Sequence, residues 1–247
     1  MRTFKSMLKT ELRLSIRGMD MLIFAICMPL VVLVILGIIY GDKPAFDGAK
    51  YSFFEQSFAA VSTIAICAGG VMGLPLVVSD YREKKILKRF KVTPISPLMI
   101  LFVQITIYAL YSVVSLILLY LTANVFFGYQ IQGSIVGFIL SFIFLMVTLF
   151  SIGMMVGGVA PNNKVAGVLA SILYFPMIIF SGATLPYEVM PKVLQKMSDI
   201  MPLTQGIKLL KATSLGMDIG NNFMEITIMC VISLTCSIIS IKYFKWE

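Results

Sequence analysis

The 247-residue chain contains no histidine, and only 13% of its residues are charged. Histidine is the commonest metal ligand and general base, so its absence argues against metal chemistry and acid–base catalysis. The sequence also has no serine-nucleophile elbow and no cluster of metal-ligand residues. It lacks the phosphate-binding loop G-x-x-x-x-G-K-S/T, so this chain does not bind ATP in the usual way. We expect no catalytic residue, metal or cofactor in it.

Disulfides and a cleaved signal peptide are not expected either. Cys27, Cys67, Cys230 and Cys236 all lie within apolar runs, where a free cysteine behaves as a small hydrophobic residue. The first long apolar run, Met21–Tyr40, is about twenty residues long and lacks a small-residue cleavage site. We expect that run to stay in the mature protein as a membrane span.

Apolar side chains make up 59% of the sequence, and its mean hydropathy is +0.95. Such a chain is too apolar for a soluble domain and indicates an integral membrane protein. The net charge of +8 does not predict nucleic-acid binding, because the basic residues lie at the ends of apolar runs and no nucleic-acid motif is present.

Six apolar segments are each long enough to cross about 30 Å of hydrocarbon as a helix. They are Met21–Tyr40, Phe54–Ser79, Leu98–Leu121, Gly133–Ala160, Val165–Ser181 and Asn222–Tyr243. The fifth is the shortest and contains Pro176. The sequence predicts an all-α protein with a single transmembrane domain over residues 1–247.

Residues 1–20 form an amphipathic pattern ahead of the first span. Phe4, Leu8, Leu12 and Ile16 repeat at a spacing of four, and so do four basic positions. The four basic positions are Lys5, Lys9, Arg13 and Arg17. The pattern predicts a helix that lies along a membrane surface against lipid headgroups. The alternative is a basic flank that only orients the first span.

The basic segment, residues 80–97, separates the second and third apolar runs and carries six Lys and Arg. Each charge placed at mid-bilayer costs about 2.5–3.5 kcal/mol, so this segment lies outside the hydrocarbon. It is predicted to form a short helix that Pro94 and Pro97 end. With the N-terminus in the cytoplasm, 14 of the 20 Lys and Arg are cytoplasmic, which favours cytoplasmic termini and a cytoplasmic basic segment.

Residues 182–221 connect the fifth and sixth spans, and prolines divide them. Val193, Leu194 and Met197, then Leu203 and Ile207, repeat at helical spacing. Two short amphipathic helices that rest on or dip into the outer face would explain this pattern. Re-entrant backbone needs cover from protein or a water-filled cavity, so the segment is interpreted as a cap on a pathway. A plain surface cap without a transport role is the alternative.

The cores of the six spans contain no charged residue that could carry ions or protons, so any transport must be driven from outside them. A separate ATPase would need a docking site on this chain. The basic segment is the best candidate for that site.

Two stretches of the sequence carry a family resemblance. The first contains Arg82-Glu83-Lys84, Leu87, Arg89, Val92-Thr93-Pro94 and Ser96-Pro97. The second contains Phe180-Ser181-Gly182, Pro186, Met190-Pro191 and Pro202-Leu203-Thr204. They are similar to the segments that type-2 ABC exporter permeases place between spans two and three and between spans five and six. With six spans and an amphipathic N-terminus, the resemblance covers essentially the whole chain.

The resemblance implies a set of roles for particular residues. A coupling helix would dock into an ABC ATPase subunit through Arg82, Glu83, Lys84, Leu87 and Arg89. The substrate cavity would lie at the interface with a second permease, identical or paralogous, and Ser62, Thr63, Tyr174 and Phe175 are assigned to its lining. Paired re-entrant helices would form an outer gate around Gly182, Pro186, Pro191 and Pro202. ATP and magnesium would bind to the partner ATPase.

The leading hypothesis is a permease subunit of an ATP-driven exporter in a bacterial cell membrane. Its cargo would be an apolar or amphipathic compound, such as a drug, an antimicrobial peptide or a lipid-like molecule. Alternatives are an ATP-independent transporter or channel, a membrane enzyme, and a membrane scaffold or immunity protein.

Overall fold

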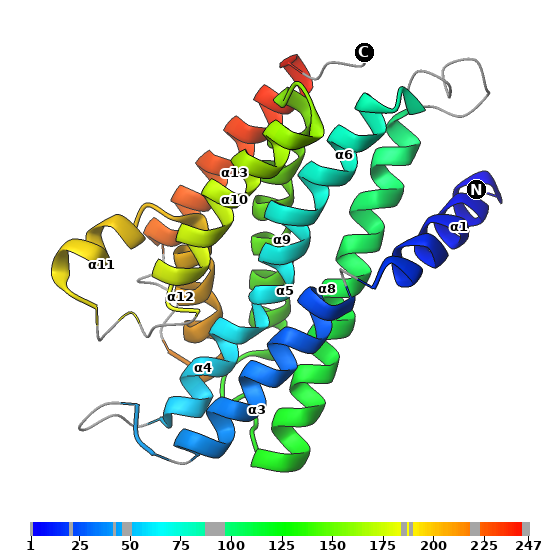
Figure 1. Ribbon diagram of the computed structural model, residues 1–247. Helices are drawn as coiled ribbons and strands as arrows, with labels where there is room; N and C mark the ends of the chain where they lie inside the picture. Colours follow the sequence, from blue (N-terminus) through cyan, green and yellow to red (C-terminus); the bar gives the residue numbers. More distant parts are fainter. Residues whose placement is uncertain are drawn as a thin grey trace.

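The computed structural model describes residues 2–19, 22–41, 43–45, 51–86, 97–183, 187, 190–217 and 223–243. These ranges fold into helices that run along one elongated bundle, with α1 at its side (Figure 1). No β-strand occurs among them beyond an isolated bridge between Pro44 and Ser52. The predicted all-α class is confirmed.

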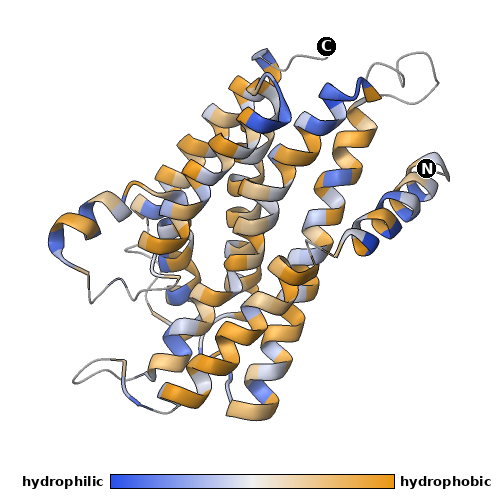
Figure 2. Ribbon diagram, viewed as in Figure 1, coloured by the Kyte–Doolittle hydropathy of each residue, from blue (hydrophilic) through white to orange (hydrophobic). Residues whose placement is uncertain are grey.

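Six helical runs within the described ranges are long and apolar enough to cross a membrane: Ile23–Tyr40, Phe53–Glu83, Leu98–Phe127, Ile135–Val159, Asn163–Phe180 and Phe223–Tyr243. The number agrees with the sequence prediction, and orange apolar residues run along these helices in Figure 2. The second span is one turn longer than predicted, because its helix continues through Asp80 to Glu83. The third ends at Phe127 instead of Leu121.

Two of the spans consist of several consecutive helical segments. The first comprises η1 (Ile23–Cys27) and α3 (Met28–Tyr40), and the second comprises α4 (Phe53–Ser62), α5 (Ile64–Cys67), η2 (Ala68–Gly73) and α6 (Leu74–Glu83). The other four spans are α8 (Pro97–Phe127), α9 (Ile135–Val159), α10 (Asn163–Phe180) and α13 (Phe223–Tyr243). Outside the spans lie α1 (Arg2–Gly18), α11 (Lys192–Ser198) and α12 (Pro202–Leu215).

Prolines divide the spans into two kinds. Pro29 and Pro75 each follow a π-helical segment, η1 and η2, and Pro176 lies inside α10. A proline within a helix removes a backbone hydrogen bond and permits bending there. The helices α9 and α13 contain no proline, and α8 has one only at its first residue, Pro97. Spans one, two and five are therefore the deformable ones.

The core is organised around α9, which packs against α13, α12, α6 and η2. The helix α9 and η2 approach each other closely, because a Cβ atom added to Gly153 would lie 1.8 Å from the carbonyl oxygen of Gly70. A larger residue at position 153 would therefore force these two backbones apart. Aromatic rings of Phe54, Phe58 and Tyr129 fill the space between α4 and α8.

The expected N-terminal amphipathic helix is present as α1. Phe4, Leu8 and Leu12 pack against the hydrophobic core, whereas Lys5 and Arg13 are exposed. Figure 2 shows the hydrophilic and apolar residues alternating along this helix at the side of the bundle. Its location at a membrane surface stays a prediction.

Candidate functional site

Arg82, the first of the predicted coupling residues, points into the protein. Its side chain is only 8% exposed, and its Nη1 atom donates to the carbonyl oxygens of Gly157, Gly158 and Ala160 at 2.9, 2.9 and 2.8 Å. These carbonyls lie at the C-terminal end of α9, where unpaired acceptors and the helix dipole favour a cation. Arg82 therefore fastens the end of span two to the end of span four.

Glu83, the next residue, is exposed and connects span two to span five. Its Oε2 atom accepts a hydrogen bond of 2.9 Å from the backbone N–H of Asn163, the first residue of α10. The hydroxyl of Ser79 donates to the side chain of the same asparagine at 3.1 Å. A carboxylate at a helix N-terminus is also favoured by the helix dipole. We call these contacts of Arg82 and Glu83 with the α9–α10 connection the Arg82–Glu83 clasp.

The other predicted coupling residues divide into described and undescribed ones. Lys84 is exposed and forms an ion pair of 2.8 Å with Asp80 one turn earlier. Lys85 adopts a positive φ of 55° directly after α6 ends, so the chain changes direction there. Leu87 and Arg89 lie outside the described residues. Docking of an ATPase by these five positions stays a prediction.

The pathway residues predicted in span two lie where α4 and α5 meet. Ser62 and Thr63 are fully buried, and their hydroxyls donate to the carbonyls of Ala59 and Ala60 at 2.8 and 2.7 Å. Such bonds to the preceding turn satisfy the hydroxyls locally and commonly accompany a helix bend. Their role in a pathway stays a prediction.

The pathway residues predicted in span five lie on α10. Tyr174 packs partly against the hydrophobic core, whereas Phe175 is 55% exposed. Phe175 belongs to an exposed apolar stripe with Val168, Ile172 and Ile179. The helix α10 also contacts α5 and η2, so predicted pathway residues of spans two and five come from neighbouring helices. Their role in a pathway is not tested by these contacts.

The predicted gate residues are turning points in the connection between spans five and six. Gly182 has a φ of 95°, a conformation that side chains disfavour, and it follows directly after α10. Pro191 precedes α11 and Pro202 is the first residue of α12. Pro186 lies outside the described residues. The two short helices that the sequence predicts in this connection are present, but a gating role stays a prediction.

The connection is held together by a polar cluster around Asp199. Tyr187 and Lys208 both donate to Asp199 Oδ1, at 2.8 and 2.6 Å. Burial alone would raise the pKa of Asp199, but the hydrogen bonds from Lys208 and Tyr187 outweigh it and lower that pKa. Burial alone would lower the pKa of Lys208, but its bond to Asp199 outweighs it and raises that pKa. We name α11, α12 and this cluster the cap.

The cap is also fastened to the spans. Ser198 donates to the carbonyl of Phe180 at the end of α10, and most residues of α12 are buried against α9, α13 and α4. The backbone N–H groups of Gln132 and Gly133 donate to the carbonyl of Ser214 at 3.0 Å. Sequence patterns predicted two short helices that rest on or dip into the outer face, but they did not predict that most of α12 is buried.

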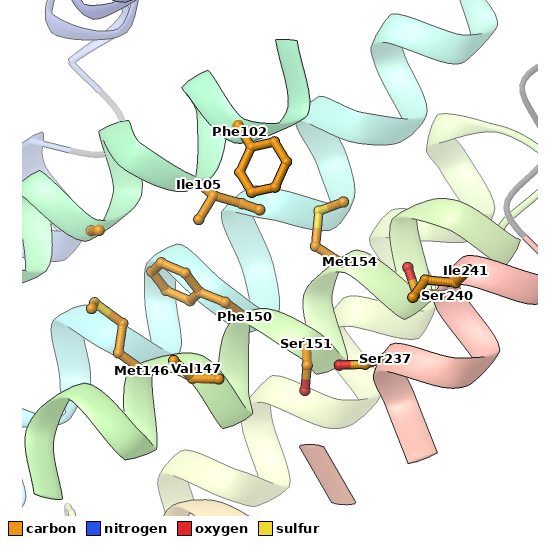
Figure 3. A pocket seen from close by; sticks show the side chains of 11 residues that line it. Phe102, Ile105, Met146, Val147, Phe150, Ser151, Met154, Ser237, Ser240 and Ile241 are labelled. Carbon is orange, nitrogen blue, oxygen red and sulfur yellow. The ribbon is translucent and has the colours of Figure 1, made fainter. Parts of the chain in front are cut away.

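A pocket of about 400 Å³ lies between α8, α9 and α13. Phe102 and Ile105 of α8 lie across it from Phe150 and Met154 of α9, and α13 contributes Ser240 (Figure 3). Its lining carries no ionisable group. The pocket therefore offers no chemistry beyond apolar contact and hydroxyl hydrogen bonds.

The described residues contain no group of three or more His, Cys, Asp and Glu that could hold a metal. Sequence reasoning missed the inward direction of Arg82, although an arginine at the end of an apolar run was a signal for it.

Comparison with known proteins shows which proteins this chain is similar to. A family model described as ABC-2 type transporter matches residues 2–215. Nodulation protein J of Rhizobium leguminosarum bv. viciae is 31% identical over 81 residues, which are 33% of this chain and 31% of that protein. Inner membrane transport permease YhhJ of Escherichia coli (strain K12) is 29% identical over 162 residues, which are 65% of this chain and 43% of YhhJ.

The matched regions span less than half the length of these relatives. The family match, in contrast, extends over most of this chain and includes α1, the first five spans and the cap. The six spans make the chain a multi-pass membrane protein. This chain belongs to the ABC-2 type transporter family.

Proposed function

We propose that this chain is the permease subunit of an ATP-driven exporter for apolar or amphipathic compounds. In this proposal a separate ABC ATPase binds ATP and magnesium and docks on the basic segment, residues 80–97. A second permease, identical or paralogous, completes the substrate cavity. Both termini and the basic segment are cytoplasmic.

Membership of the ABC-2 family supports the first part, because it implies an ABC ATPase as a partner in general. The similarity to the inner membrane transport permease YhhJ of Escherichia coli supports a transport role. The direction of transport and the chemistry of the cargo belong to the proposal.

The Arg82–Glu83 clasp is the observation that carries the proposal. The first four residues of the basic segment, including Arg82 and Glu83, form the last turn of α6, so a push on the rest of the segment acts first on these two side chains. Arg82 transfers that push to the end of α9, and Glu83 transfers it to the start of α10. Since packed helices move as bodies, the ends of spans two, four and five would move together.

Movement of these ends requires flexible points farther along the spans. In the proposal, η2 with Pro75, and the region of Pro176, absorb the bend while α9 and α13 stay straight. The cap would then open or close the far end of a cavity between two copies of α10. The exposed stripe of Val168, Ile172, Phe175 and Ile179 suits such an apolar wall.

The test is charge reversal in the basic segment. Glu83→Lys with Arg89→Glu is expected to abolish permease-stimulated ATP hydrolysis, or assembly with the ATPase, while the permease still folds. Glu83→Gln is the matched control, because its amide oxygen can still accept the hydrogen bond from Asn163. Undiminished transport by the double variant, with protease accessibility showing unchanged topology, would contradict docking at this segment.

A further inference from the structure

A second pocket, of about 480 Å³, lies between α1, η1, η2, α6 and α8. Pockets that hold drug-sized ligands measure about 300–1,000 Å³. Most of the lining is apolar, and it includes Phe24 of η1 and Leu76 of α6. Its polar groups come from Glu11, Ser15, Tyr81, Gln104 and Tyr108. The pocket thus joins an apolar wall to a small polar end beside α1.

Among the described residues that line the pocket, Glu11 is the only charged one. Its Oε2 atom accepts hydrogen bonds from Tyr81 Oη at 2.6 Å and from Gln104 Nε2 at 3.0 Å. No described residue donates a hydrogen bond to its Oε1 atom, and no described Lys or Arg forms an ion pair with it. The carboxylate is therefore held in a fixed position with one oxygen left for a ligand.

An anionic group at an apolar pocket favours a cation as its ligand. The two neutral donors on Oε2 replace only part of the hydration that a partly buried carboxylate loses, whereas an ammonium group would add an opposite charge and a charge-assisted hydrogen bond at Oε1. The aromatic rings of Tyr81, Tyr108 and Phe24 also favour a cation over an anion. The apolar wall, in turn, fits a hydrocarbon chain.

We propose that this pocket binds a single-chain amphiphile whose protonated amine contacts Glu11 and whose tail lies along Phe24 and Leu76. The amphiphile enters from the membrane leaflet beside α1. The proposed exporter would carry this amphiphile as its cargo. Only the cargo role rests on the proposed function. Binding itself requires neither ATP nor the ATPase.

The test is equilibrium dialysis of radiolabelled dodecylammonium against the full chain in phosphatidylcholine nanodiscs, with empty nanodiscs as background. Glu11→Gln keeps an acceptor for Tyr81 and removes the charge. It is expected to weaken dodecylammonium binding about tenfold or more, as for the loss of a charged hydrogen bond. Binding of uncharged dodecanol is expected to be unchanged.

Glu55→Gln is the matched control, because it removes a carboxylate outside the pocket and glutamine can replace glutamate in a capping box. It should bind dodecylammonium as the wild type does. Leu14→Trp adds bulk at a pocket residue that is 55% exposed, and it should weaken both ligands equally. This second variant tests the pocket even if Glu11→Gln does not fold.

Wild-type binding of dodecylammonium by Glu11→Gln, or by Leu14→Trp, would overturn the proposal. Displacement of the probe by phosphatidylethanolamine in the nanodisc would also overturn it, because the occupant would then be a two-chain lipid. Binding through Glu11 in a permease that stimulates no ATPase would leave the pocket assigned and would contradict the exporter function instead.

Discussion

Two ends of the same bundle are held together in different ways. At the end where α6 meets α9 and α10, the Arg82–Glu83 clasp concentrates the contacts on two adjacent side chains. At the other end, the cap spreads its contacts over Asp199, Ser198 and the buried face of α12. Loss of one side chain should therefore break most of the clasp, whereas loss of one side chain should weaken the cap only in part.

The largest predicted effect is at Arg82. Arg82→Met leaves the carbonyls at the end of α9 without their buried donor, so we expect the free energy of unfolding to fall by about 3 kcal/mol. Arg82→Lys keeps the charge but loses the planar guanidinium, so its loss should be smaller. Thermal unfolding in detergent measures both. Wild-type stability of Arg82→Met would show that the clasp is not a concentrated contact.

Gly206 tests the packing of the cap. A Cβ atom there would lie 2.4 Å from Leu145 Cδ1, so Gly206→Ala should destabilise the protein by about 2 kcal/mol through overpacking. The matched control is Gly167→Ala on α10, where the nearest atom would be 3.5 Å away. Thermal unfolding of both variants under one condition makes the comparison. Equal stability of the two would contradict tight packing of α12 against α9.

Because of the Asp199–Lys208 pair, the stability of the cap should depend on pH only at acidic and alkaline extremes. The pKa of Asp199 is lowered, so the stability that its carboxylate gives the cap is lost as the pH falls through a value below about 3.9. The pKa of Lys208 is raised, so the stability that its ammonium group gives the cap is lost as the pH rises through a value above about 10.4. The protection factors of α11 and α12, which are hydrogen-exchange rates corrected for the intrinsic pH dependence of amide exchange, should be constant between these limits.

For Asp199→Asn, hydrogen exchange at neutral pH should report a loss of about 1 kcal/mol or less, because both partners are partly exposed. The same variant should also remove the change below pH 4. A transition near neutral pH would contradict the assignment of the cluster to this pair.

The smallest effect is expected at Lys84. Its ion pair with Asp80 is largely exposed, so Lys84→Ala should change stability by less than about 0.5 kcal/mol. A larger loss in thermal unfolding would mean that the clasp extends to Lys84. ATPase docking can therefore be measured on this variant without a confounding change in fold.

The sequence predicted the repetitive parts of this fold well. Six apolar runs, the spacing of Phe4, Leu8 and Leu12, and the prolines of the connection led to six spans, α1 and two short helices. These features depend on local periodicity. The resemblance to ABC exporter permeases rested on two motifs, and the family match supports it.

The clasp and the pocket at Glu11 depend on contacts between distant residues. Arg82 reaches Gly157 across 75 residues, and Tyr81 reaches Glu11 across 70. No periodicity encodes such pairs, so Arg82 was assigned to docking only, and Glu11 was not assigned. The same limit applies to Ser62 and Thr63, whose hydroxyls are used by their own helix.

In the proposed mechanism, Glu83 makes α10 follow the basic segment. The direct measurement is transport per ATP hydrolysed by the assembled complex carrying Glu83→Ala, beside Glu83→Gln. Loss of the bond to Asn163 should lower this ratio about tenfold in Glu83→Ala, whereas Glu83→Gln should stay near the wild type. A wild-type ratio in Glu83→Ala would contradict the account.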